Sequence, residues 1–294
     1  MVVRVVLLGT AAGGGFPQWN CACALCTAAR DGKLPARAQE CVAVTGNSRD
    51  WWLLNASPDI RTQLAATAPL WPGPGRSTPV RGVLLTDAEA DHVGGLAVLR
   101  GGADLRVYAA PPVLAALAPL RAALDRYAAW QWADALTEGG FVLAGGLVVT
   151  AHPVGAKTPR YLAAAADDRW VVAYRVEDLA TGGVLAYAPC VGAWSPVLDE
   201  LLGTADCALL DGTFYAADEM GTVVPGAAGQ GAMGHLPVAG AQGSLVALAR
   251  HPGPRRIYTH LNNTNPLLDP ASAARQRIAE AGAEVLADGA EFAV

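Results

Sequence analysis

The chain has 294 residues, which is long enough for one large domain or two, each with a full hydrophobic core. Hydrophobic residues make up 52% and charged residues 16%, which excludes a disordered protein, and no apolar run approaches the roughly eighteen residues that a membrane helix needs. The formal net charge is −5 and lysine occurs only at Lys33 and Lys157, so nothing favours a nucleic-acid partner.

The N-terminal segment predicts a strand over residues 2–8, because it is rich in β-branched valine and too short in its apolar part for a signal peptide. A glycine-rich turn follows over residues 9–15. It lacks the G-x-G-x-x-G spacing and the following helix of a dinucleotide site. We interpret the turn as the wall of a site, where the backbone passes close to another group.

Three cysteines crowd into the loop over residues 20–27 in the pattern C-x-C-x-x-C, namely Cys21, Cys23 and Cys26. Thiols at this spacing can converge on one tetrahedral cation, usually Zn²⁺. The fourth ligand is open between Cys41 and a residue brought in by folding, such as Asn263. The clustering indicates a structural zinc and a reducing, cytoplasmic compartment. Cys190 and Cys207 lie in apolar surroundings and are interpreted as inert core residues.

The stretch over residues 81–95, RGVLLTDAEADHVGG, joins an apolar run to a dense group of polar residues. The run predicts a buried strand, and Asp87, Glu89, Asp91 and His92 follow it. Such residues would lie at the rim of a sheet, where α/β proteins keep their chemistry. Three carboxylates so close together repel one another unless a cation or a proton neutralises them. A solvated acidic turn is the alternative.

Two short β-like runs between residues 41 and 55 flank a turn at Gly46-Asn47 and predict a hairpin. Further strands are predicted over residues 105–109, 148–154, 170–176, 184–188, 207–210, 257–259 and 284–287. Helices are predicted over residues 95–100, 111–124, 196–202, 238–250 and 270–281. Strands in groups with interspersed helices predict a layered α/β (α+β) fold, and a single domain over residues 1–294 is the simplest account.

Two later strands also end in candidate ligands, at Asp211 and His260. Together with Asp91 and His92 they supply two imidazoles and two carboxylates, a mixed set that suits Fe²⁺, Mn²⁺ or Zn²⁺. Open positions on such a metal would take water, oxygen or substrate. The strand ends therefore predict one active-site divalent metal.

The order T-D-A-E-A-D-H over residues 86–92, a later Asp and T-H at 259–260 resemble the metallo-β-lactamase fold, a four-layer αββα sandwich with the signature H-x-H-x-D-H. Asp87 and Glu89 stand where that signature has its two leading histidines, and residues 155–156 stand where a third is expected. The resemblance therefore implies that the first metal site is lost. It assigns the remaining metal to four residues, Asp91, His92, Asp211 and His260.

A closer resemblance is to the PqqB family of pyrroloquinoline quinone (PQQ) biosynthesis, carried by LLGTAAGGGFPQWNCACALC, NASPDIR, LTDAEADHVGGL, DGTF, MGHLPV and THLNNTNPLLD. It implies a mononuclear non-haem iron oxygenase that uses O₂ to hydroxylate the tyrosine ring of a peptide-derived Glu–Tyr precursor. One alternative is a carrier that transports PQQ or its precursor to the periplasm. Another is a hydrolase, against which the missing first-site histidines argue.

The resemblance also implies roles for residues around the metal. The substrate ring would bind near Trp19 and Asn20, and Arg61 and the amides of residues 13–15 would receive substrate carboxylates. A structural ion pair is the alternative for Arg61.

Three further residues are assigned in the same way. His235 would be a general base or would hydrogen-bond a metal ligand, with a core histidine as the alternative. Asp87 and Glu89 would bind substrate amines or tune the metal. A homodimer and contacts with other PQQ biosynthesis proteins are further expectations.

Overall fold

The computed structural model describes residues 2–163 and 166–294, which form two seven-stranded sheets. The first sheet has the order β14-β1-β2-β3-β4-β5-β6 and the second the order β13-β12-β11-β10-β9-β8-β7. The first contains β1 (Arg4–Gly9), β2 (Cys41–Thr45), β3 (Trp51–Leu54), β4 (Val80–Leu84), β5 (Arg106–Ala109), β6 (Gln131–Asp134) and β14 (Glu291–Ala293). The second contains β7 (Phe141–Leu143), β8 (Leu147–Gly155), β9 (Val171–Asp178), β10 (Val184–Ala188), β11 (Cys207–Asp211), β12 (Arg255–Thr259) and β13 (Ala283–Glu284).

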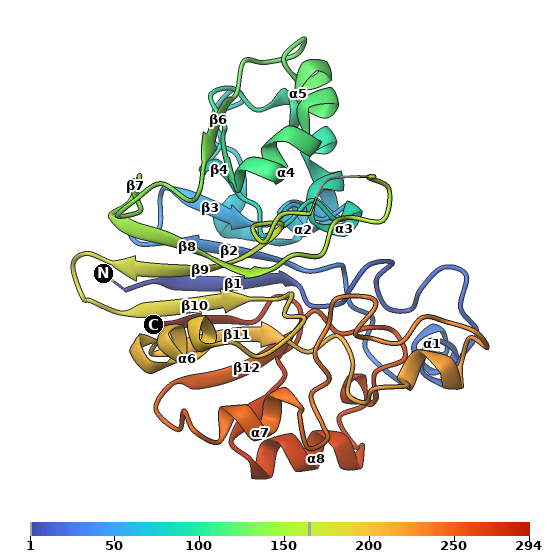
Figure 1. Cartoon of the computed structure of the whole chain (residues 1–294). Helices are drawn as coiled ribbons and strands as arrows, with labels where there is room; N and C mark the ends of the chain where they lie inside the picture. The colour runs from blue at the N-terminus through green and yellow to red at the C-terminus, as the bar shows by residue number, and fades with distance from the viewer. Residues whose placement is uncertain (1, 164–165) are drawn as a thin grey trace.

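Helices cover the outer side of each sheet, as Figure 1 shows. Those beside the first sheet are α2 (Ile60–Ala66), α3 (Ala90–Val93), α4 (Pro111–Ala116) and α5 (Ala118–Leu124). Those beside the second are α6 (Pro196–Thr204), α7 (Ser244–Leu248) and α8 (Ala273–Glu280), while α1 (Ala24–Arg30) lies among the loops at one end. Short 3₁₀ helices are η1 (Ala68–Leu70), η2 (Gly94–Gly101), η3 (Glu219–Thr222) and η4 (Pro266–Leu268). The expected αββα sandwich is confirmed.

The alternation of side chains along β11 explains why every residue of that strand is buried. Cys207 and Leu209 belong to the core cluster shared by the two sheets, whereas Ala208 and Leu210 pack in the cluster beneath α6 and α8. Successive side chains of a strand point to opposite faces, so a strand covered on both faces is apolar throughout. Polar residues therefore follow the end of such a strand, and the polar residues that follow neighbouring strands lie close together and form the site.

The predicted helix over residues 111–124 is wrong in one respect, because it divides at Leu117 into α4 and α5. Pro119 lies in the first turn of α5, and its ring cannot donate to the carbonyl four residues earlier. The helix predicted over residues 238–250 is confined to α7, since Gly240 takes a φ of +98° and interrupts the backbone before Ser244. In the described part of the chain, no helix is both long and apolar enough to cross a membrane.

Candidate metal centre

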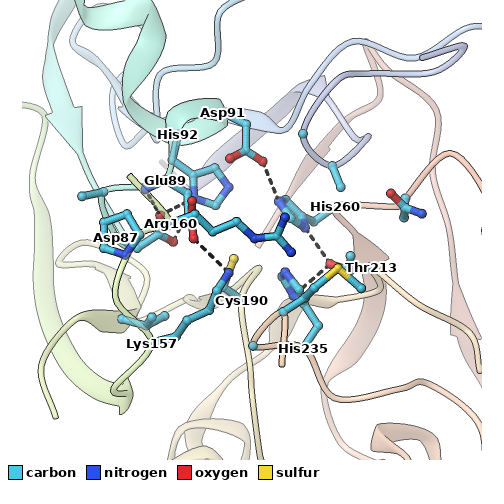
Figure 2. A pocket seen from close by; sticks show the side chains of 18 of the residues that line it. Asp87, Glu89, Asp91, His92, Lys157, Arg160, Cys190, Thr213, His235 and His260 are labelled. Atoms are coloured by element: carbon cyan, nitrogen blue, oxygen red, sulfur yellow. Dashed lines mark hydrogen bonds and ion pairs between the residues drawn. The ribbon is translucent and has the colours of Figure 1, made fainter. Parts of the chain in front are cut away.

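A pocket opens where the loops after β4, β8, β10, β11 and β12 meet the turn after β1 (Figure 2). It encloses about 220 Å³, which is space for a small molecule and not for a polypeptide segment. Parallel pairing of β3 with β4, of β10 with β11 and of β11 with β12 aligns the carboxyl ends of these strands. The charged and polar residues labelled in the figure are Asp87, Glu89, Asp91, His92, Lys157, Arg160, Cys190, Thr213, His235 and His260.

His92 lies fully buried on α3, with its two ring nitrogens in different surroundings. Its Nδ1 lies 2.8 Å from Asp87 Oδ2 and 2.9 Å from Asp87 Oδ1, and Thr86 Oγ1 donates to the same carboxylate at 2.9 Å. Among the described residues, its Nε2 has no hydrogen-bond partner. A buried nitrogen without a partner is costly, and a histidine held by a carboxylate through Nδ1 is the usual form of a metal ligand. The residues therefore fit a divalent metal at Nε2.

Asp91 precedes His92 on α3, and His260 approaches both residues from the end of β12. Asp91 Oδ2 lies 3.3 Å from His260 Nε2, and the rings of His92 and His260 are 5.1 Å apart. Thr213 Oγ1 holds the other nitrogen of His260 at 2.7 Å. The backbone of His260 takes a φ of +59°, a strained conformation that functional sites often retain. The structure thus brings together three of the four residues expected around the metal.

Asp211, the fourth, lies behind His235 and Thr213. One of its carboxylate oxygens, Oδ2, accepts from the Val191 amide at 2.8 Å and lies 2.8 Å from His235 Nδ1. The other accepts from the amide and hydroxyl of Thr213 at 2.9 and 2.6 Å. Burial raises the pKa of Asp211, but His235, His260 and Thr213 outweigh this effect and leave the pKa lowered.

His235 lies inside the pocket and is not a residue of the apolar core. Its ring stacks on that of His260 at 5.4 Å, and ligand atoms of Asp211, His235 and His260 all lie within 4.8 Å of one another. A metal beside His260 could thus be reached by Asp211 or by His235. The sequence predicted that His235 would act as a general base or hydrogen-bond a metal ligand, and did not place it among the metal ligands.

Cys190, interpreted from the sequence as an inert core residue, does belong to the core cluster, but the sequence did not indicate its place in the site. It is buried but lines the pocket, and its Sγ lies within 4.8 Å of ring nitrogens of His92 and His260. Burial and the nearby carboxylates of Asp87 and Asp211 raise the pKa of the thiol well above its usual value. The available signal was its position two residues after the end of β10, at the same edge as the other strand ends.

Lys157, which the sequence did not single out as a site residue, pairs with one carboxylate of the acidic stretch. Its Nζ lies 2.9 Å from Glu89 Oε1. Glu89 is therefore paired with a cation and Asp87 is hydrogen-bonded to His92, so both carboxylates expected to bind substrate amines or tune the metal already have partners within the chain. Both carboxylates that replace first-site histidines are thus occupied by side chains of the chain itself.

The charges around the pocket leave a deficit of two. The carboxylates are Asp87, Glu89, Asp91 and Asp211, and the side-chain cations are Lys157 and Arg160. Burial lowers the pKa of His92, but without a metal Asp87 and Asp91 outweigh this effect and raise the pKa to about 10. A metal ligand must be neutral, and with neutral histidines the cations balance only half of the carboxylates. One divalent metal ion would supply the remaining charge, and a second would exceed it.

Three residues expected to bind substrate lie elsewhere. Trp19 is 84% exposed, Asn20 is exposed in the same loop, and Arg61 is exposed on α2. None of them lines the pocket as the described residues form it. Gly13 does line it, and a Cβ atom there would lie 3.1 Å from Asp91 Oδ2. The expected site wall is therefore present, whereas Trp19, Asn20 and Arg61 are not part of the pocket lining.

The three cysteines of the loop form a second candidate centre. The Sγ atoms of Cys21, Cys23 and Cys26 lie within 4.8 Å of one another. The carboxamide of Asn263 lies 3.1 Å from Cys21 Sγ and 3.4 Å from Cys26 Sγ. Cys41 is excluded as the fourth ligand, because it is buried in the first sheet and its thiol donates to the Asn55 carbonyl at 3.2 Å. Of the two open candidates, only Asn263 reaches the thiols.

Comparison with known proteins places this geometry in a family. The model of the Beta-lactamase superfamily domain matches residues 50–261. Coenzyme PQQ synthesis protein B of Pseudomonas syringae pv. syringae (strain B728a) is 38% identical over 296 residues, which cover 97% of this chain and 98% of the relative. Zn²⁺-bound PqqB from Methylobacterium extorquens superposes with a TM-score of 0.90 at 35% identity, over 99% of this chain and 100% of that one. A diphosphatase of the PhnP family, at 18% identity and a TM-score of 0.70, shares the fold alone.

Proposed function

This chain belongs to the family of coenzyme PQQ synthesis protein B, within the β-lactamase superfamily, and we propose that it is a metal-dependent enzyme of PQQ biosynthesis. The observation that carries this proposal is the buried Nε2 of His92, which has no partner among the described residues and lies beside Asp91 and His260 in a pocket rich in carboxylates. The reaction we propose is hydroxylation of the tyrosine ring of a Glu–Tyr precursor with O₂, as a mononuclear non-haem iron oxygenase.

Asp91, His92 and His260 would hold the active-site metal, with Asp211 or His235 completing the set. When bound there, Fe²⁺ would supply the activation of O₂, whereas Zn²⁺ would not. The chain itself orients the ligands, because Asp87 holds His92 through Nδ1 and Thr213 holds His260 through Nδ1. The Nε2 of His92 is thereby left without a partner among the described residues, and the Nε2 of His260 faces Asp91, the third proposed ligand, at 3.3 Å.

His235 is suited to move a proton of the substrate. Asp211 contacts its Nδ1 at 2.8 Å, which favours the tautomer that carries a proton there and a lone pair on Nε2. A phenol of the substrate in the pocket could then give its proton to Nε2. Phe214 packs edge-on against the ring at 5.9 Å and limits its movement.

A structural zinc is the second part of the proposal. Cys21, Cys23 and Cys26 would hold it, and the carboxamide of Asn263 would be the fourth ligand. Asn263 lies three residues after His260. Zinc in this loop would therefore anchor the segment that carries an active-site histidine.

The test is a reconstitution. The purified protein is loaded anaerobically with Fe²⁺ and given the Glu–Tyr precursor, and O₂ is admitted with a reductant. We expect a product heavier by oxygen in the mass spectrum, and none from His92→Ala or Asp91→Ala. Product that persists in these variants would overturn the site assignment. Tight binding of the quinone without turnover, with any metal, would favour the carrier.

A further inference from the structure

Arg160 is a cation that extends into the pocket without a partner. Its side chain reaches across the cavity toward the side that carries His260 and Thr213 (Figure 2). No hydrogen bond or ion pair joins it to any residue that the structure describes. The other cations of the same segment are paired, since Lys157 contacts Glu89 at 2.9 Å and Arg169 contacts Asp167 at 2.7 Å. An unpaired guanidinium in a pocket is available to a ligand.

The backbone on either side of Arg160 is held in place. Pro159 is buried against the pocket, and its ring restricts the preceding turn. The Tyr161 hydroxyl donates to the Ala88 carbonyl, which lies between Asp87 and Glu89 in the acidic loop. The residue is therefore tied to the metal-binding loop by its neighbours while its own side chain stays free. Such an arrangement lowers the entropy lost when a ligand binds.

We propose that Arg160 is a substrate-binding residue that receives one carboxylate of the substrate and directs the rest of the molecule toward His92 and His260. A planar guanidinium matches a carboxylate with two parallel hydrogen bonds. Lys157 is already neutralised by Glu89, so in the described lining Arg160 is the free side-chain cation. It can balance a single negative charge, whereas a phosphate dianion would meet the surrounding carboxylates. That the carboxylate belongs to the Glu–Tyr precursor rests on the function proposed above. That Arg160 prefers a carboxylate ligand is independent of that function.

The experiment compares two ligands that differ only in charge. Zn²⁺-loaded protein is titrated calorimetrically with 3-(4-hydroxyphenyl)propionate and with its neutral amide. We expect the acid to bind about tenfold tighter or more. Arg160→Gln should abolish this preference and Arg160→Lys should restore part of it, because lysine keeps the charge but not the paired hydrogen bonds. Arg169→Gln, on the same segment but paired with Asp167, is the matched control and should behave as the wild type.

Three outcomes would overturn the proposal. One is a preference for the acid that persists in Arg160→Gln, which would place the carboxylate on the metal. Another is the absence of any preference in the wild type. The third is tighter binding of 4-hydroxyphenyl phosphate than of the acid. If the wild type prefers the acid through Arg160 but never hydroxylates the precursor, only the proposed function fails. With an active enzyme, Arg160→Gln should lower kcat/KM, chiefly through a higher KM, and Arg169→Gln should not.

Discussion

A buried carboxyl beneath the metal centre makes the stability of this protein depend on pH in a way that one substitution can isolate. Glu40 is fully buried, its Oε2 accepts from the Tyr187 hydroxyl at 2.6 Å, and its Oε1 has no partner among the described residues. Burial raises its pKa to about 7, although His92 and Tyr187 act in the opposite direction. Glu40→Gln keeps the shape and the acceptor for Tyr187 but cannot ionise.

The size of the effect follows from the two pKa values. An unfolded glutamate has a pKa of 4.5, so between this value and about 7 the folded chain holds more protons than the unfolded chain. Stability contributed by this group therefore falls as pH rises through that window. The loss is about 3 kcal/mol in all, since each tenfold difference in proton affinity corresponds to about 1.4 kcal/mol. The variant should not lose this stability.

Urea denaturation at pH 5 and at pH 8, with the metal content held constant, measures the effect. Other groups titrate in the same range, so the informative quantity is the difference between wild type and variant at each pH. We expect that difference to shift by about 2 kcal/mol in favour of Glu40→Gln on going from pH 5 to pH 8. Glu138→Gln, which changes an exposed glutamate, should show no shift. An identical difference at both pH values would refute a raised pKa at Glu40.

Three further predictions test the two metal centres and the pocket. Asn263→Ala should release one equivalent of zinc during dialysis against a chelator, whereas Cys41→Ser should retain it; equal zinc contents by elemental analysis would argue against Asn263 as a ligand. His92→Ala should lower the affinity for the active-site metal by tenfold or more in chelator competition and leave the cysteine-bound zinc in place. An unchanged affinity would contradict the assignment of His92 as a ligand. Gly234→Ala should cost about 1–3 kcal/mol in urea denaturation, because a Cβ atom there would lie 2.2 Å from Lys157 Cδ at a φ of +79°; wild-type stability would show that Lys157 can move aside.

The sequence by itself determined which residues come to the same edge of the molecule. A buried strand is apolar until it ends, so the sequence pattern alone is enough to place Asp91 and His92 in the segment after one strand and His260 directly after another. The cysteine loop is recognisable for a similar reason, since three thiols within six residues are near one another in almost any conformation. The family and its αββα sandwich followed from these local patterns.

Only the tertiary structure decided which atoms face one another across that edge. Asn263 reaches Cys26 over 237 residues of sequence, and no local spacing encodes that contact. Asp87 turns to His92 and Lys157 turns to Glu89, so two carboxylates expected to meet the substrate are engaged within the protein. These pairings depend on how the two sheets and their loops pack, because side chains at neighbouring strand ends compete for the same cations and donors. The pocket left after that competition, with Arg160 unpaired, is a property of the fold and not of any segment.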